Sequence, residues 1–316
     1  MVGNAKNAGK TTVLNALAAS FPEAVLGLSS IGLDGEELDL VSQLPKPQVH
    51  VSVGTLVGIA EGCLAQSATR LEVLEKTGVM TAMGEVLIAR ATGAGACLLG
   101  GPSTVEGMEK VMRLLQAHGA SRLFIDGAFA RQSHAAVGEG LVYVVGAHKS
   151  PFLQTVVDSA ALALRRLSLP AAPPSFAFLW AQRRPGWLDA AGQFTPLGLD
   201  AAPIDLHDTL GCLPSQAAWL YLPGFVDKAQ VTALVARRRE LHVGLITRSP
   251  LSLVMEDASL KKLFRLDLPI QVLKPARVAF VALNPVSPGA HQFDAAAFQA
   301  AMAAVTDLPL INVLED

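Results

Sequence analysis

The stretch Asn4-Ala5-Lys6-Asn7-Ala8-Gly9-Lys10-Thr11-Thr12, close to the start of the chain, is the most informative part of the sequence. Its Gly9-Lys10-Thr11 core is typical of a phosphate-binding loop, in which backbone N–H groups surround the phosphates of a nucleotide. In such a loop the lysine reaches the β- and γ-phosphates, and the hydroxyl of Thr11 is a ligand of Mg²⁺. The predicted nucleotide-binding residues of this stretch are Gly3, Asn7, Ala8, Gly9, Lys10, Thr11 and Thr12.

A helix is expected directly after the loop. Val13, Leu14 and Leu17 recur at helical spacing, with alanines between them. The positive N-terminus of this helix would point toward the bound phosphate. Loop and helix therefore predict the same anion site.

The loop departs from the usual pattern in its first residue. Asn4 stands where a glycine is normal, and Gly3 lies one residue earlier. Either the loop is one residue longer, or Asn4 adopts the left-handed conformation that asparagine tolerates. A buried strand of about five residues normally precedes such a loop, but only Met1 and Val2 precede Gly3. We expect a chain truncated upstream, the alternative being a strand that is nearly absent.

Composition limits the class of protein. The chain has 316 residues, of which 51% are hydrophobic, 16% charged and 5% aromatic, with a net charge of −2. This predicts large buried cores and two domains, and it gives no basic surface for nucleic acid. Cys63, Cys97 and Cys212 have no paired spacing, which favours the cytoplasm over a disulfide framework. No membrane span is expected, and the low charge favours a surface covered by a partner or by a second copy in a homo-oligomer.

The first half alternates between strand and helix patterns, which predicts a P-loop NTPase-like, doubly wound parallel sheet. The expected strands cover residues 24–31, 48–53, 85–89, 96–99, 122–127 and 141–146. The expected helices cover residues 54–68 and 104–117.

A proline-rich segment, residues 168–174, predicts a boundary between a nucleotide-binding domain, 1–169, and a smaller C-terminal α/β domain, 170–316. The strands expected in the second domain are 176–180, 218–222, 242–246, 270–273, 278–283 and 308–313. Helices are expected at 227–239 and 293–305.

Two acidic residues are candidates for the nucleotide site. Asp126 ends an apolar strand and is followed by Gly127, as expected of an acid that holds Mg²⁺ and assists catalysis. Asp34 follows an earlier strand, where a segment that senses the γ-phosphate is common; Glu36 is its alternative, and a solvated turn fits equally well. An Asn-Lys-x-Asp motif is absent from the sequence, which favours ATP over GTP.

Other polar pairs are assigned no catalytic role. His134 and His148-Lys149 are expected in exposed loops, and His207-Asp208 has no accompanying nucleophile. Asn284-Pro285 is expected to form a turn at a strand end.

Several segments together resemble the phosphate-loop subunit of the reactivase for lysine 5,6-aminomutase, a mutase that depends on cobalamin and pyridoxal phosphate. They are Lys6-Asn7-Ala8-Gly9-Lys10-Thr11-Thr12, Ser30-Ile31-Gly32-Leu33-Asp34-Gly35-Glu36, Leu44-Pro45-Lys46-Pro47, Thr81-Ala82-Met83-Gly84-Glu85-Val86, Ile125-Asp126-Gly127-Ala128 and Leu283-Asn284-Pro285-Val286-Ser287-Pro288.

The resemblance implies a chaperone-like role. A MutS-like ATPase partner and this subunit would together release inactivated cobalamin from lysine 5,6-aminomutase, using ATP or GTP with Mg²⁺. It implies nucleotide contacts for Gly9, Lys10 and Thr11 and matching positions for Asp34 and Asp126. Leu33 replaces an arginine usual in that family, and Arg131 corresponds to a second one.

Two other functions fit the residues. A small-molecule kinase or ligase of the dethiobiotin synthetase kind has the same Gly3-to-Gly9 spacing in its loop. A structural subunit that binds a partner without hydrolysing nucleotide would explain Asn4 and the short first strand. The absence of a recognisable water-positioning residue favours a nucleotidase that depends on a partner.

Overall fold

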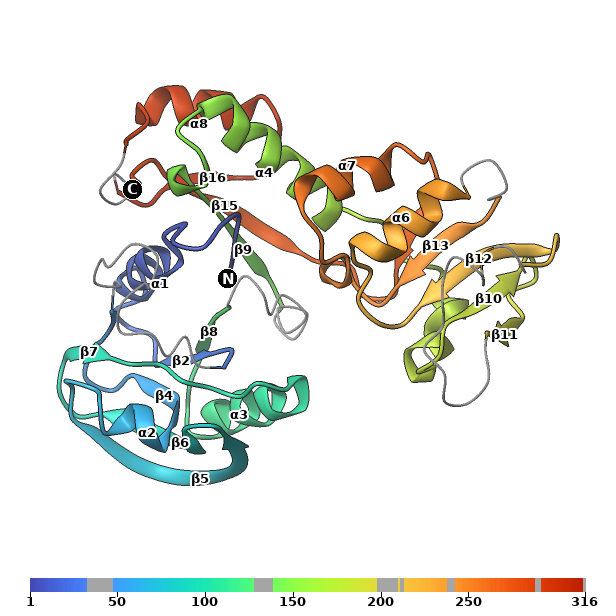
Figure 1. The fold of residues 1–316 in the computed structure, drawn as a ribbon. Coiled ribbons are helices and arrows are strands. Elements are labelled where there is room, and N and C mark those ends of the chain that lie inside the picture. The colour runs from blue at the N-terminus through green and yellow to red at the C-terminus, as the bar shows by residue number, and fades with distance from the viewer. Residues whose placement is uncertain are drawn as a thin grey trace. The chain divides into compact units, whose positions relative to one another are not determined.

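The computed structural model describes residues 1–32, 48–127, 139–197, 210, 213–237, 242–287 and 291–314. They form two compact units: unit 1 comprises residues 1–157 and 278–316, and unit 2 comprises residues 158–277. The division differs from the predicted boundary between residues 169 and 170, because the C-terminal segment belongs to unit 1. Unit 2 is thus an insertion in unit 1, as the colours of Figure 1 show.

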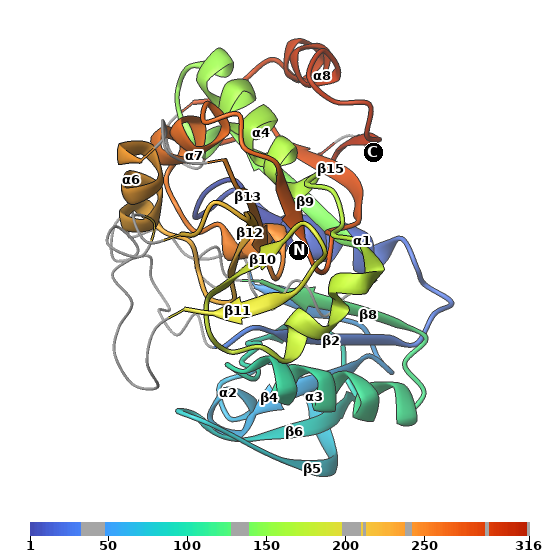
Figure 2. The ribbon, with the colours of Figure 1, turned by 90° about the vertical axis from the view of Figure 1, so that its right-hand side faces the viewer.

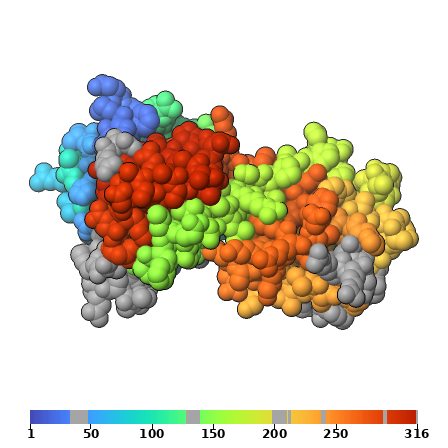
Figure 3. All heavy atoms as spheres, turned by 90° about the horizontal axis from the view of Figure 1, so that it is seen from above, coloured from blue at the N-terminus to red at the C-terminus, as the bar shows by residue number. Residues whose placement is uncertain are grey.

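The first sheet of unit 1, sheet A, is parallel throughout and joins both ends of the chain. Its four strands in spatial order are β1 (Val2–Gly3), β9 (Leu141–Gly146), β15 (Val278–Asn284) and β16 (Leu310–Asn312). In Figure 3 the blue N-terminal and red C-terminal atoms lie in the same part of the molecule. Apolar runs such as Leu141–Gly146 are typical of parallel strands, which are covered on both faces.

The second sheet of unit 1, sheet B, is mixed. Its strands in spatial order are β5 (Leu71–Thr81), β6 (Gly84–Ala91), β4 (Leu56–Ala60), β2 (Leu26–Ser30) and β8 (Arg122–Asp126). β2 is parallel to β4 and β8, whereas β6 is antiparallel to β4 and β5. Helix α3 (Val105–Ala117) packs on this sheet (Figures 1 and 2), and the Thr104 side chain caps it by accepting from the Gly107 N–H. The short antiparallel ribbon of β3 (Val49–Val51) and β7 (Gly95–Cys97) lies alongside.

Helix α1 (Lys10–Ala19) contributes to two cores of unit 1. Val13 packs with Val144 and Ala282 of sheet A, while the next residue, Leu14, packs with Leu28 of sheet B. Both α1 residues are fully buried. The helix that follows the phosphate loop therefore lies between the two sheets.

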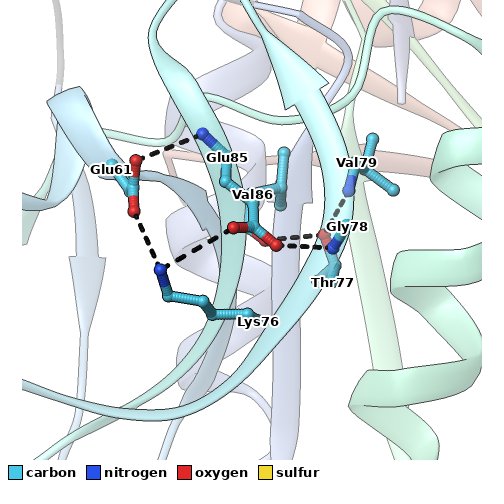
Figure 4. A network of polar contacts seen from close by, with 7 residues as sticks. All are labelled: Glu61, Lys76, Thr77, Gly78, Val79, Glu85 and Val86. Atoms are coloured by element: carbon cyan, nitrogen blue, oxygen red, sulfur yellow. Dashed lines mark hydrogen bonds and ion pairs between the residues drawn. The ribbon is translucent and has the colours of Figure 1, made fainter.

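A polar network stabilises the β5–β6 hairpin at an irregular turn of β5 (Figure 4). The Gly78 N–H donates to Glu85 Oε1 at 2.6 Å, and Thr77 Oγ1 donates to the Val86 carbonyl at 2.6 Å. Lys76 Nζ lies 3.8 Å from Glu61 and 3.9 Å from Glu85. Because the lysine is exposed, these ion pairs contribute little, and the hydrogen bonds between the Glu85 and Thr77 side chains and the backbone hold the bulge.

Unit 2 has its own mixed sheet and core. Its elements are the 3₁₀ helix η3 (Pro174–Ala181), β10 (Gly186–Asp189), β11 (Phe194–Pro196), β12 (Ala217–Leu222), α6 (Lys228–Ala236), β13 (Gly244–Thr247), η4 (Pro250–Ser252), α7 (Asp257–Phe264) and β14 (Ile270–Val272). The strand order is β11-β10-β12-β13-β14, and β12, β13 and β14 are parallel. Helix α4 (Leu153–Leu167) leads from unit 1 into unit 2.

Most predicted elements are confirmed, and two are wrong. Residues 54–68 contain the strand β4 and the short helix α2 (Glu61–Leu64), because a fully buried apolar run has no period that separates strand from helix. Residues 176–180 form η3 and no strand, since Pro174 starts a helical turn whose Phe176 and Leu179 point into the core. The long edge strand β5 was not predicted. The overall class is mixed α/β, with one parallel and two mixed sheets among the larger ones.

No helix in the described part of the chain has the length and apolar character needed to span a bilayer. Cys63 and Cys97 are buried free thiols. The cytoplasmic location stays a prediction.

Cys97 is expected to be almost unreactive in the folded protein. Burial raises the pKa of its thiol to about 11, with the hydrogen bond from Ser67 opposing the shift and Cys63 adding to it. Because alkylation needs the thiolate, the reaction at pH 8 should be about a hundredfold slower than in the unfolded chain. The raised pKa of Cys97 stabilises the folded state below pH 9, and this stabilisation is lost as the pH rises toward 11. Iodoacetamide labelling with peptide mass spectrometry, in buffer and in urea, measures the ratio; equal rates would contradict the expectation.

Candidate functional site

The predicted phosphate loop begins with a buried asparagine that continues the pairing of β1. The Asn4 N–H donates to the Val144 carbonyl at 2.9 Å. Its side-chain Oδ1 accepts from the Gly146 N–H at 3.1 Å, and Nδ2 donates to the Gly146 carbonyl at 3.4 Å. Asn4 thus ties the loop to the end of β9, a role that glycine could not fill.

The left-handed asparagine of the loop is Asn7, with φ 58°, so the expectation of that conformation at Asn4 was wrong. The φ angle of Asn4 is not positive, and its hydrogen bonds go to β9. Gly9, with φ 99°, is the second left-handed residue of the loop and the N-cap of α1.

The middle of the loop lies directly on the carboxyl end of sheet A. A Cβ atom at Gly146 would lie 2.5 Å from the Ala8 carbonyl oxygen and 2.6 Å from the Ala8 Cα. Ala8 is fully buried by this approach. Only glycine at position 146 leaves room for the loop.

The N-terminus of α1 is open. Its first intrahelical bond runs from the Val13 N–H to the Gly9 carbonyl at 3.0 Å, so the N–H groups of residues 10–12 have no acceptor within the helix. The N-cap residue Gly9 has no side chain that could cap the helix, and the first turn holds no acid. In the described part of the chain, the half-buried Lys10 and Thr11 side chains make no hydrogen bond or ion pair. Open N–H donors at a helix N-terminus beside a lysine are groups that attract an anion.

The Met1 amino group donates to the Ile125 carbonyl at 2.8 Å. Burial lowers the pKa of this amino group; Asp126 opposes the shift, and Lys10 adds to it. Because Ile125 belongs to β8, Met1 connects the edge strand of sheet B to β1, the edge strand of sheet A.

Residues from the C-terminal segment contact the loop and the residues after β9, and these contacts were not predicted. Asn284 ends β15 and donates from Nδ2 to the Ala8 carbonyl at 3.2 Å. Ser287 Oγ lies 3.0 Å from His148 Nδ1, and His291 Nε2 lies 2.9 Å from the Ala147 carbonyl. The only sequence signal was a polar residue at the end of an apolar strand, and that pattern equally describes an ordinary turn.

Several predicted residues lie outside the described part of the chain. They are Leu33, Asp34, Glu36, Arg131, His134, His207 and Asp208. Within the described ranges, no cluster of three or more His, Cys, Asp or Glu side chains could hold a metal ion. A Mg²⁺ ion at Thr11 and Asp126 stays a prediction.

Comparison of the chain with protein-family models, with curated proteins and with solved structures gave no match.

Replacing Gly146 by alanine should displace the loop. The added Cβ meets backbone atoms that cannot rotate away, so unit 1 should lose about 1–3 kcal/mol of stability. Gly93→Ala is the control, because the nearest atoms to its added Cβ lie 4.0 Å away. Trp180, Trp187 and Trp219 all lie in unit 2, so tryptophan fluorescence would not report on unit 1. Hydrogen exchange of peptides from α1 and β9 is the measurement, and equal protection in both variants would refute the steric argument.

Proposed function

We propose that unit 1 is a nucleotide-binding unit of the P-loop NTPase kind. One observation supports this above all: the N-terminus of α1 is open, and the loop before it is held from behind by Gly146 and Asn284. A close backbone approach of this kind leaves the N–H groups on the opposite side of the loop available to phosphate.

The residues present suit a nucleotide with Mg²⁺. Lys10 would neutralise the β- and γ-phosphates, and Thr11 would be a Mg²⁺ ligand. Asp126, which shares the Met1 environment with Lys10, would hold the ion or its water. Mg²⁺ supplies charge neutralisation of the phosphates, and the protein positions them.

We extend the proposal to reactivation of a cobalamin enzyme on the basis of the segments that resemble the reactivase subunit. In this role the chain works with a MutS-like ATPase to release inactive cofactor from lysine 5,6-aminomutase. Phosphoryl transfer needs a water-positioning group, and the loop and strand ends described here provide none that is evident. Turnover is therefore expected to depend on the partner.

A kinase or ligase of the dethiobiotin synthetase kind is the second candidate. The observation in its favour is the spacing of two glycines. Gly3 ends β1 and lies six residues before Gly9, as in the loop of that enzyme class. A bound acceptor that takes up phosphate would distinguish it from the reactivase.

Lys10→Ala should abolish nucleotide binding without unfolding the protein. The side chain makes no described hydrogen bond or ion pair, so its loss removes a ligand contact and no core contact. Lys110→Ala, an exposed lysine on α3, is the control. Isothermal titration with ATP and Mg²⁺ gives the affinity, and circular dichroism gives the fold. If Lys10→Ala unfolds the chain, the lysine is structural and the assignment fails.

Hydrolysis of ATP and GTP should appear only in the complete system. The rate is measured for the protein alone, with the MutS-like partner, and with the partner and inactivated aminomutase. Turnover limited to the mixtures supports the reactivase. Steady turnover by the lone protein with a small acceptor supports the kinase or ligase, and the lack of any saturable binding supports a structural subunit.

A further inference from the structure

We infer that Asn284 is a positioning residue of the phosphate loop: its amide group sets the direction of the peptide between Ala8 and Gly9. The identity of the anion rests on the proposed function. The effect on the loop rests only on contacts within the protein.

Two hydrogen bonds determine the orientation of the Asn284 amide. Oδ1 accepts from the Val286 N–H at 3.2 Å, and Nδ2 donates to the Ala8 carbonyl at 3.2 Å. A flipped amide would place the NH₂ group against a donor and the oxygen against an acceptor. The side chain is 7% exposed, so water does not readily replace either partner. The donor is thus fixed toward the loop.

The direction of the Ala8 carbonyl determines that of the next N–H group. In a trans peptide the C=O and the N–H point in opposite directions. With the Ala8 carbonyl bonded to Asn284, the Gly9 N–H points away from Asn284. Gly9 is left-handed and Lys10 begins the right-handed helix, a succession that aims neighbouring N–H groups at one anion.

Asn284 also explains why position 9 is glycine. A Cβ atom at Gly9 would lie 2.4 Å from Asn284 Nδ2 and 3.1 Å from Cγ. The asparagine therefore supports the loop by contact as well as by its hydrogen bond. Its removal would leave a buried carbonyl without a donor, which is costly.

The test uses two variants and a matched control. Asn284→Asp keeps the size of the side chain and the bond from Val286, and it replaces only the donor with an oxygen that repels the Ala8 carbonyl. Asn284→Ala removes both bonds. Asn312→Ala is the control, because Asn312 ends β16, one strand further from the loop, and its Oδ1 accepts from the Leu314 N–H at 3.2 Å in a similar turn.

The first readout is hydrogen exchange of the loop, residues 4–12, in the protein without ligand. Both Asn284 variants should exchange faster there than the wild type, and Asn312→Ala should not. Unchanged exchange in Asn284→Asp would overturn the inference whether or not the protein binds nucleotide.

The second readout is the affinity for Mg²⁺ complexes of ATP, GTP and inorganic tripolyphosphate. Asn284→Ala should weaken all three equally, by about fivefold to tenfold, as expected for one net hydrogen bond. Asn284→Asp should weaken them further through its negative charge. A loss for ATP with tripolyphosphate unchanged would assign the residue to the base and refute the inference. If the wild type binds none of the three, the proposed function fails, and loop exchange alone decides the role of Asn284.

Discussion

The parallel pairing of β9 with β15 is the contact on which the loop before α1 depends. Its register places Asn284 opposite Gly146. Gly146, which has no side chain, and the polar side chain of Asn284 are therefore neighbours at the carboxyl end of sheet A. Ala8 packs on Gly146, and Gly9 packs against Asn284. A shift of the register by one residue would bring a side chain under Ala8 and turn Asn284 to the other face of the sheet.

Helix α1 connects this edge to the rest of unit 1. Its adjacent residues Val13 and Leu14 are buried in different cores, which a helix can do only when it lies between two layers. The position of Asp126 follows from the same arrangement, because β8 approaches β1 at Met1. Lys10 begins α1 and Asp126 ends β8, and their opposite charges shift the pKa of the buried Met1 amino group in opposite directions.

The insertion of unit 2 between β9 and β15 has a modest energetic cost. The entropy lost on closing a loop grows only with the logarithm of its length. A folded insert also lowers the effective length, because its own core orders the intervening residues. The strands of sheet A can therefore pair across residues 158–277.

Most of the local elements could be predicted from the sequence, and so could the position of the loop before α1. Gly9, Lys10 and Thr11 followed by an apolar helix predict a phosphate loop, and Thr104 and Asp227 mark helix starts through hydrogen bonds to the first turn. The strands β8, β9 and β12 could also be predicted from the sequence, because each is a short apolar run with turn residues at its ends. The fully buried β4 could not be predicted, since its sequence shows no alternation of apolar and polar residues.

Only the tertiary structure decided which strands are neighbours and which side chains complete the site. The apolar run that forms β15 fits a second domain as well as the first, because partner choice depends on contacts far along the chain and leaves no local pattern. The roles of Asn4 and Asn284 could not be predicted for the same reason. An asparagine at a strand end can close a turn or hold a loop, and only its hydrogen-bond partners distinguish the two roles. Those partners, Gly146 and Ala8, meet the asparagines only when both ends of the chain enter one sheet.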